Sequence, residues 1–194
     1  PGVRALPHNG FDAVLFDLAG TLLDTIPFIL ESHRASLMAV LGETWDDGYL
    51  LGTIGRPLED AFLPAPEDKR RELLDTYLRY NADHLAGGIG IFLGVLPMLR
   101  DIATHFPTVR TAVLTSKRRA SARSSLALFG LDDWFPLVFT KEDSLRHKPD
   151  PEPLRVAMDR MGLPDPARVL YVGDSLHDLE CARAAGCRIA IVEW

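Results

Sequence analysis

The sequence predicts an α/β protein built on a doubly wound parallel sheet, with a helical cap inserted after the first strand. Short, nearly continuous apolar runs alternate with helical patterns along most of the chain. Such runs indicate strands that are buried on both faces, as in a parallel sheet covered by helices. One long interval after the first apolar run shows helical spacing only, which indicates an inserted helical module.

The expected strands are short runs rich in apolar and β-branched residues. In chain order they are residues 13–18, 111–115, 137–139, 169–172 and 189–192. Helical patterns lie between them, at residues 96–106, 118–129, 151–161 and 177–185. Pro151 suits a first helical turn, where its missing N–H is not needed. Gly130, Gly162 and Gly186 follow helix ends, where glycine commonly adopts the left-handed conformation that stops a helix.

The interval 25–93 contains no strand-like run and is too long for a structureless loop in a compact domain. Apolar residues recur there at helical spacing, first at Ile26, Ile29, Leu37 and Leu41, then around Leu74, Tyr77, Leu78, Asn81 and Leu85. The interval leaves and rejoins the sheet near the carboxyl end of the first strand. Because open α/β sheets bind ligands there, a lid over the site is favoured above additional core packing. The expected organisation is a core at 1–24 and 94–194 and a helical cap at 25–93.

The composition is that of a globular protein, with 47% apolar and 25% charged residues among 194. A net charge of −6 argues against nucleic acid or an anionic membrane as partner. No apolar run approaches the ~18 residues of a membrane span, and residues 1–10 lack a signal-peptide pattern. Cys181 and Cys187 are expected to be reduced core residues. These observations predict a cytoplasmic protein. We expect a monomer or a weak dimer.

Carboxylates follow two of the expected strands. Asp17 comes directly after the first strand and precedes the turn at Gly20 and Thr21. Asp174 follows the apolar run 169–173, and Asp178 lies four residues further on. If the two strands are neighbours, these oxygen ligands meet at one sheet edge and suit Mg²⁺.

Three motifs in order resemble those of the haloacid dehalogenase-like hydrolases: FDLAGT around Asp17, HKPDP around Lys148 and VGDSLHD around Asp174. Most members are phosphatases that use an aspartyl-phosphate intermediate. The resemblance implies a Rossmann-like catalytic core, a bound Mg²⁺ and a small phosphorylated substrate. It covers nearly the whole chain and points to the phosphoglycolate phosphatase and pyrophosphatase branch.

The same resemblance implies roles for individual residues. Asp17 would be the nucleophile, and Lys148 would offset the charge of the nucleophile and of the phosphoryl group. The hydroxyl of Thr115, or that of Ser116 in its place, would hold a phosphoryl oxygen. The metal would be bound by Asp17, Asp174 and the backbone carbonyl of Ala19, with Asp178 orienting metal-bound water from outside.

Arg56, in the segment TIGRPL of the expected cap, is the candidate for substrate recognition. Glycine and proline shape a tight segment around it, and its guanidinium suits a carboxylate or a second phosphate. A solvated surface arginine is the alternative, and the sequence does not choose between the two.

Ala19 departs from the family pattern, because the phosphatases carry a second aspartate at this place. That acid protonates the leaving oxygen and then activates water, help that is typically worth ~10²–10⁴ in rate. Phosphate esters with poor leaving groups should suffer most from its loss, and acyl phosphates least. Three hypotheses follow, of which a weakened Mg²⁺-dependent phosphatase is preferred.

The second hypothesis is a resemblance to the phosphonoacetaldehyde hydrolases, which carry alanine here and use a cap lysine to form a Schiff base. It is disfavoured because Lys69, in a charged helix start, is the one lysine between Thr25 and Leu93. The third is a non-catalytic phospho-ligand-binding or regulatory protein that keeps the metal site without efficient chemistry.

Overall fold

The computed structural model describes residues 10–194, so the expectation about a signal peptide falls almost entirely outside the described residues. A five-stranded parallel sheet has the order β5-β4-β1-β6-β7. Its strands are β1 (Ala13–Phe16), β4 (Arg110–Leu114), β5 (Leu137–Phe139), β6 (Val169–Gly173) and β7 (Arg188–Ile191). The predicted α/β class with a doubly wound parallel sheet is confirmed.

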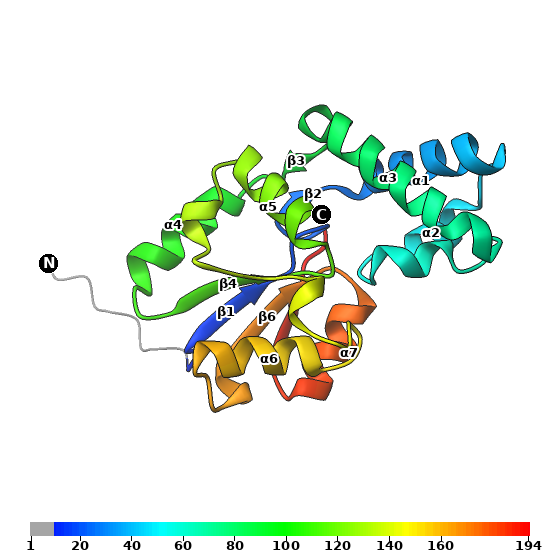
Figure 1. The fold of residues 1–194 in the computed structure, drawn as a ribbon. Helices are drawn as coiled ribbons and strands as arrows, with labels where there is room; N and C mark the ends of the chain where they lie inside the picture. The colour runs from blue at the N-terminus through cyan, green and yellow to red at the C-terminus, as the bar shows by residue number, and fades with distance from the viewer. Residues whose placement is uncertain (1–9) are drawn as a thin grey trace, which may run out of the picture.

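Helices cover both faces of the sheet, as Figure 1 shows. One face packs against α4 (Val95–His105) and α5 (Arg119–Leu128), and the other against α6 (Glu152–Met161) and α7 (Leu176–Ala185). Alternate residues of β1 enter the two cores, and all four residues of this strand are buried. The central position of β1 explains its continuous apolar sequence.

Short 3-10 turns and glycines join these elements. The turns are η1 (Leu58–Phe62), η2 (Asp132–Trp134), η3 (Lys141–Asp143) and η4 (Pro166–Arg168). Gly162 and Gly186 end α6 and α7 in the left-handed conformation, as their positions in the sequence predicted.

Three of the helices between β1 and β4 form a group beyond the carboxyl ends of the strands (Figure 1): α1 (Ile26–Leu41), α2 (Asp47–Thr53) and α3 (Glu67–Gly88). They share an apolar cluster that includes Leu37, Leu50, Phe62 and Leu73. The hydroxyl of Ser36 on α1 donates to the carbonyl of Leu73 on α3 at 2.6 Å.

The expectation that no strand lies between Thr25 and Leu93 is wrong at one place. The chain leaves the sheet through β2 (Leu23–Asp24) and returns through β3 (Gly90–Ile91), and these two strands pair antiparallel. Each has two residues, too few for an alternating pattern to be visible in the sequence. This pairing holds together the two segments that connect the sheet to the helical group.

The two cysteines, Cys181 and Cys187, are free and buried, as expected. Among residues 10–194, no helix has the length and apolar character that crossing a membrane requires.

Candidate active site

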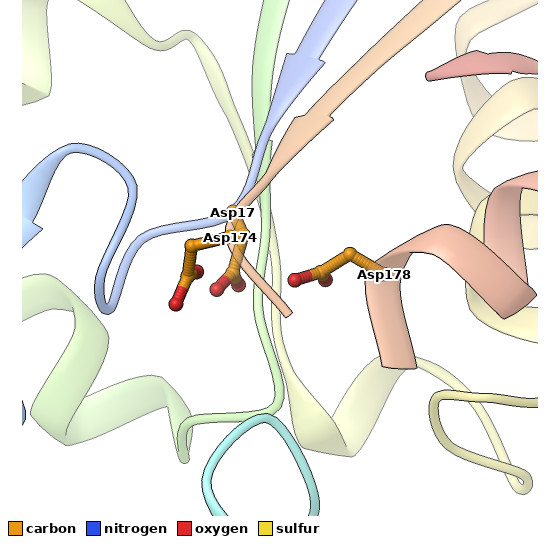
Figure 2. Close-up of side chains that lie close together, drawn as sticks. All are labelled: Asp17, Asp174 and Asp178. Atoms are coloured by element: carbon orange, nitrogen blue, oxygen red, sulfur yellow. The ribbon is translucent and has the colours of Figure 1, made fainter. Parts of the chain in front are cut away.

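The register of the sheet brings the first group of candidate residues to one edge. Phe16 of β1 pairs with Val113 of β4 on one side and with Val172 of β6 on the other. The residues that follow these strands therefore emerge together at the carboxyl edge, among them Asp17 and Asp174. Figure 2 shows their carboxylates side by side, with Asp178 reaching toward them from α7.

Lys148 lies between two of these carboxylates. Its Nζ is 3.0 Å from Oδ1 of Asp17 and 2.6 Å from Oδ1 of Asp178. Only 3% of Lys148 is exposed. Burial alone would lower the pKa of this ammonium, but the charges of Asp17 and Asp178 outweigh it and raise the pKa above its usual range. Lys148 is a fixed positive charge beside Asp17.

Asp178 serves both the helix and the site. Its Oδ2 accepts hydrogen bonds from the backbone N–H and the hydroxyl of Ser175, at 3.0 and 2.6 Å, in a capping box that begins α7. Its Oδ1 accepts from Lys148 and from the hydroxyl of Tyr171 at 3.0 Å. Burial would raise the pKa of this carboxyl, but Lys148 outweighs it and the pKa is lowered. Asp178 is therefore an anion with both oxygens engaged.

Tyr171 was not singled out from the sequence. Its hydroxyl lies 3.1 Å from Nζ of Lys148 and 3.1 Å from the carbonyl of Leu114, and its ring is fully buried. A tyrosine inside an otherwise apolar strand is the one available signal, because a buried hydroxyl needs a partner.

Asp17 and Asp174 carry the remaining negative charge. Burial raises the pKa of Asp17 to about 7, against the opposing effect of Lys148, and burial also raises the pKa of Asp174. The hydroxyl of Thr21 donates to Oδ1 of Asp174 at 2.9 Å. Carboxylate oxygens of Asp17, Asp174 and Asp178 all lie within 4.8 Å of one another. Three carboxylates facing one ammonium are oxygen donors that suit a divalent cation such as Mg²⁺.

The turn after Asp17 requires glycine at position 20. Gly20 has a φ of +80°, and a Cβ at this position would lie 2.2 Å from Oδ2 of Asp174. An L side chain would therefore be strained and would displace the carboxylate. The glycine of the FDLAGT motif allows the turn that carries Ala19 to approach Asp174.

A cavity of about 80 Å³ opens beside Asp17, between the sheet edge and the helical group. Its sheet side includes Asp17, Ala19, Thr115 and Lys117. Its other side includes Ile29, His33, Ile54, Leu58, Tyr77, Leu78 and Asn81. Of the predicted residues, Thr115 is buried and Arg56 is exposed, and both line this cavity.

Ser116 contacts the chain segment that contains Arg56. Its hydroxyl donates to the carbonyl of Gly55 at 2.6 Å, which joins the sheet edge to the segment before Arg56. Gly55 has a φ of +93°, and a Cβ there would lie 3.1 Å from Oγ of Ser175. This segment therefore packs directly on the rim of the site.

Lys117 also lines the cavity, next to Asp17 and Ala19. Within residues 10–194, no hydrogen bond or ion pair is formed by its ammonium. Burial lowers the pKa of Lys117 to about 8, against the opposing effect of Asp17. The neighbouring Arg118 differs, because it forms an ion pair with Glu59, which also binds Lys141.

The histidine of the cavity was not anticipated by the sequence analysis, because it has no partner spacing. His33 is 2% exposed, and its ring lies 5.3 Å from that of Phe62 and 4.7 Å from that of Tyr77. Its Nδ1 is buried without a hydrogen-bond partner in the described part of the chain. Burial lowers the pKa of His33 to about 4, so its ring is neutral at pH 7.

The chain belongs to the haloacid dehalogenase-like hydrolases, whose family model matches residues 14–192. The sequence is 35% identical over 182 residues to a PpaX protein of Caldanaerobacter subterraneus subsp. tengcongensis, covering 94% of this chain and 81% of the relative. It is 31% identical over 183 residues to pyrophosphatase PpaX of Halalkalibacterium halodurans, covering 94% and 84%.

The fold is also similar to solved structures. A predicted phosphoglycolate phosphatase from Haemophilus somnus superposes with a TM-score of 0.84 at 24% identity, covering 94% of this chain and 85% of that one. The resemblance drawn from the three sequence motifs is confirmed at the level of the family and of the fold.

Proposed function

We propose that this hydrolase is an Mg²⁺-dependent phosphatase that acts on a small phosphorylated substrate through an aspartyl phosphate on Asp17. The observation that carries the proposal is the buried Lys148 ammonium, held 3.0 Å from Asp17 within the cluster that Asp17 forms with Asp174 and Asp178. A cytoplasmic location fits the two free, buried thiols.

The chemistry follows from the arrangement of these groups. A carboxylate oxygen of Asp17 attacks phosphorus, and the bond from phosphorus to the leaving oxygen breaks. Water then cleaves the aspartyl phosphate and restores Asp17. Lys148 offsets charge on the nucleophile and on the phosphoryl group, and Thr115 donates its hydroxyl to a phosphoryl oxygen.

Mg²⁺ would be held by Asp17, Asp174 and the carbonyl of Ala19, and would neutralise the charge that repels a phosphate dianion. The raised pKa values of Asp17 and Asp174 support this assignment, because buried carboxylates in excess need a cation. Asp178 would act from outside the metal ligands, since its oxygens are engaged by Lys148, Tyr171 and Ser175.

We further propose that residues 25–93 act as a cap over a core of residues 1–24 and 94–194. The cap helices would close the cavity and exclude water. Arg56, at the exposed margin of the cavity, would meet an anionic group of an entering substrate. The contact between Ser116 and Gly55 would hold the cap segment near the phosphoryl group.

The proposed substrates carry a leaving group that departs without an acid. Ala19 offers no proton, so acyl phosphates and phosphoanhydrides should react faster than alkyl phosphates. The name pyrophosphatase PpaX, borne by a relative at 31% identity, agrees with a phosphoanhydride.

The test is phosphate release from acetyl phosphate and p-nitrophenyl phosphate, with and without Mg²⁺. We expect Mg²⁺-dependent release that falls by at least about 10³-fold in Asp17→Asn, because the amide is not a nucleophile. The control is Asp83→Asn, the same change at an exposed position of α3. Absence of turnover, with metal-dependent binding of phosphate retained, would instead indicate a phospho-ligand-binding protein.

Phosphonate hydrolysis gains no support. Lys69, the one lysine of the cap, is half-exposed on α3 and forms an ion pair with Glu72 at 3.1 Å. Inactivation by borohydride in the presence of phosphonoacetaldehyde would contradict the phosphatase proposal.

A further inference from the structure

The cavity wall beside the nucleophile lacks a group that the proposed reaction needs. When the bond from phosphorus to the leaving oxygen breaks, negative charge develops on that oxygen. Ala19 lines the cavity next to Asp17 but has neither a charge nor a proton to offer. Another side chain that faces the same space must stabilise the leaving oxygen, or esters with basic leaving groups will not react.

The cations around the site are not equally available for this task. Lys148 is held by Asp17 and Asp178. Arg118 is paired with Glu59, and Arg56 is exposed at the margin of the cavity. Lys148 is therefore engaged by the nucleophile, Arg118 by a glutamate of the cap, and Arg56 by solvent.

Lys117 differs from these cations in both surroundings and pairing. It lines the cavity with Asp17 and Ala19, and its ammonium has no partner among residues 10–194. An ammonium that lines the cavity without a partner is available to an anion that arrives with the ligand.

We propose that the ammonium of Lys117 binds the leaving-group oxygen, in place of the acid that position 19 lacks. This inference rests on the proposed function. As the bond from Asp17 to phosphorus forms and the bond to the leaving oxygen breaks, the bonding pair passes to that oxygen. The oxygen departs as an anion hydrogen-bonded to Lys117 and takes its proton from water. Lys117 is thus a catalytic residue that acts by charge and by one hydrogen bond.

The test compares substrates whose leaving groups differ in basicity: acetyl phosphate, p-nitrophenyl phosphate and phenyl phosphate. In Lys117→Met, kcat/KM should fall on the order of 10²-fold for phenyl phosphate, which is the usual cost of one lost donor to a developing oxyanion. The loss should shrink as the leaving group becomes less basic, and acetyl phosphate should be little affected. Lys69→Met, the same change at a half-exposed lysine of the cap that does not line the cavity, should leave all three rates unchanged.

A second variant distinguishes a role of Lys117 at the leaving group from a role in binding phosphate. Adding Ala19→Asp to Lys117→Met should restore most of the phenyl phosphate rate, because the new carboxyl supplies the missing proton. Lys117→Met should fold normally, since it removes an unpaired charge, and its thermal midpoint checks this.

An equal loss on all three substrates, or no recovery with Ala19→Asp, would overturn the role of Lys117 while leaving the phosphatase in place. Absence of Asp17-dependent release in the unsubstituted protein would overturn the proposed function and this inference with it. A loss that grows with leaving-group basicity and is recovered by Ala19→Asp would support both.

Discussion

The two walls of the cavity differ in the kinds of side chain that line them. The sheet side is charged and densely bonded: Lys148, Asp178 and Tyr171 satisfy one another, and Asp17 faces the open space. The cap side is largely apolar, and its histidine, His33, is neutral and has no partner at Nδ1 among residues 10–194. A fixed charge pattern suits a phosphoryl group that is common to many substrates. A largely apolar wall suits the part of a substrate that varies.

The two walls should also respond differently to amino-acid substitution. On the sheet side, the buried charges of Lys148, Asp17 and Asp178 are matched to one another, so removing one leaves its partners buried without compensation. On the cap side, side chains contribute mainly apolar contact, so changes of shape should matter more than changes of charge. Three substitutions test this contrast, and they are given in order of decreasing expected effect.

Lys148→Met should have the largest effect. It leaves Asp17 and Asp178 buried side by side without their ammonium, which should cost about 3–5 kcal/mol of stability and abolish turnover. Urea unfolding at pH 7 measures the first, and phosphate release from acetyl phosphate measures the second. Arg146→Met, at an exposed ion pair nearby, should change stability by less than about 1 kcal/mol. Similar losses in the two variants would show that the sheet side does not depend on this buried charge.

His33→Phe should alter the pH dependence of stability. The pKa of His33 is about 4 when folded and 6.5 when unfolded, so the unfolded chain binds the proton more tightly. Stability from this residue is complete above pH 6.5 and is lost as the pH falls toward 4, by about 3 kcal/mol in total.

The phenylalanine variant cannot take up that proton and should keep this part of its stability in acid. Urea midpoints at pH 7, 5.5 and 4 for both proteins measure the difference. His105→Phe, at an exposed histidine of α4, serves as the control. Parallel pH curves for His33→Phe and the unsubstituted protein would show that the cap histidine is accessible to protons in the folded state.

Gly55→Ala should have the smallest effect on stability, and its main effect should be on substrate binding at the rim of the cavity. The positive φ of Gly55 costs an alanine about 1–2 kcal/mol, and the new Cβ would press on Ser175. We expect a raised KM, because the cap segment must shift away from Ser116. Gly52→Ala, in α2 with open space around it, should be neutral or slightly stabilising. Equal kinetics in the two variants would argue against a close-fitting rim.

Much of the sheet side could be predicted from the sequence. Apolar runs that end in Asp17, Thr115 and Asp174 gave the strands and the edge, because parallel strands present their carboxyl ends together. Glycine caps gave two helix ends. The role of each residue in the reaction was drawn from resemblance and stays a proposal.

The cap side could not be predicted in the same way. His33 sits on α1 without a partner in the sequence, and its ring meets Tyr77 only because α1 packs against α3. Likewise, the bond from Ser116 to Gly55 joins residues that are far apart in the chain and have no shared motif. Periodicity shows which face of a helix is buried, but it does not show what that face meets.

Asp178 has a consequence for how the protein loses activity. The same carboxylate caps the first turn of α7 and pairs with Lys148. The charge balance of the site therefore depends on whether that turn is folded. Fraying of that turn would free an ammonium beside the nucleophile long before the sheet itself came apart. Catalytic failure under mild stress should therefore be local and reversible, with the remainder of the molecule still folded.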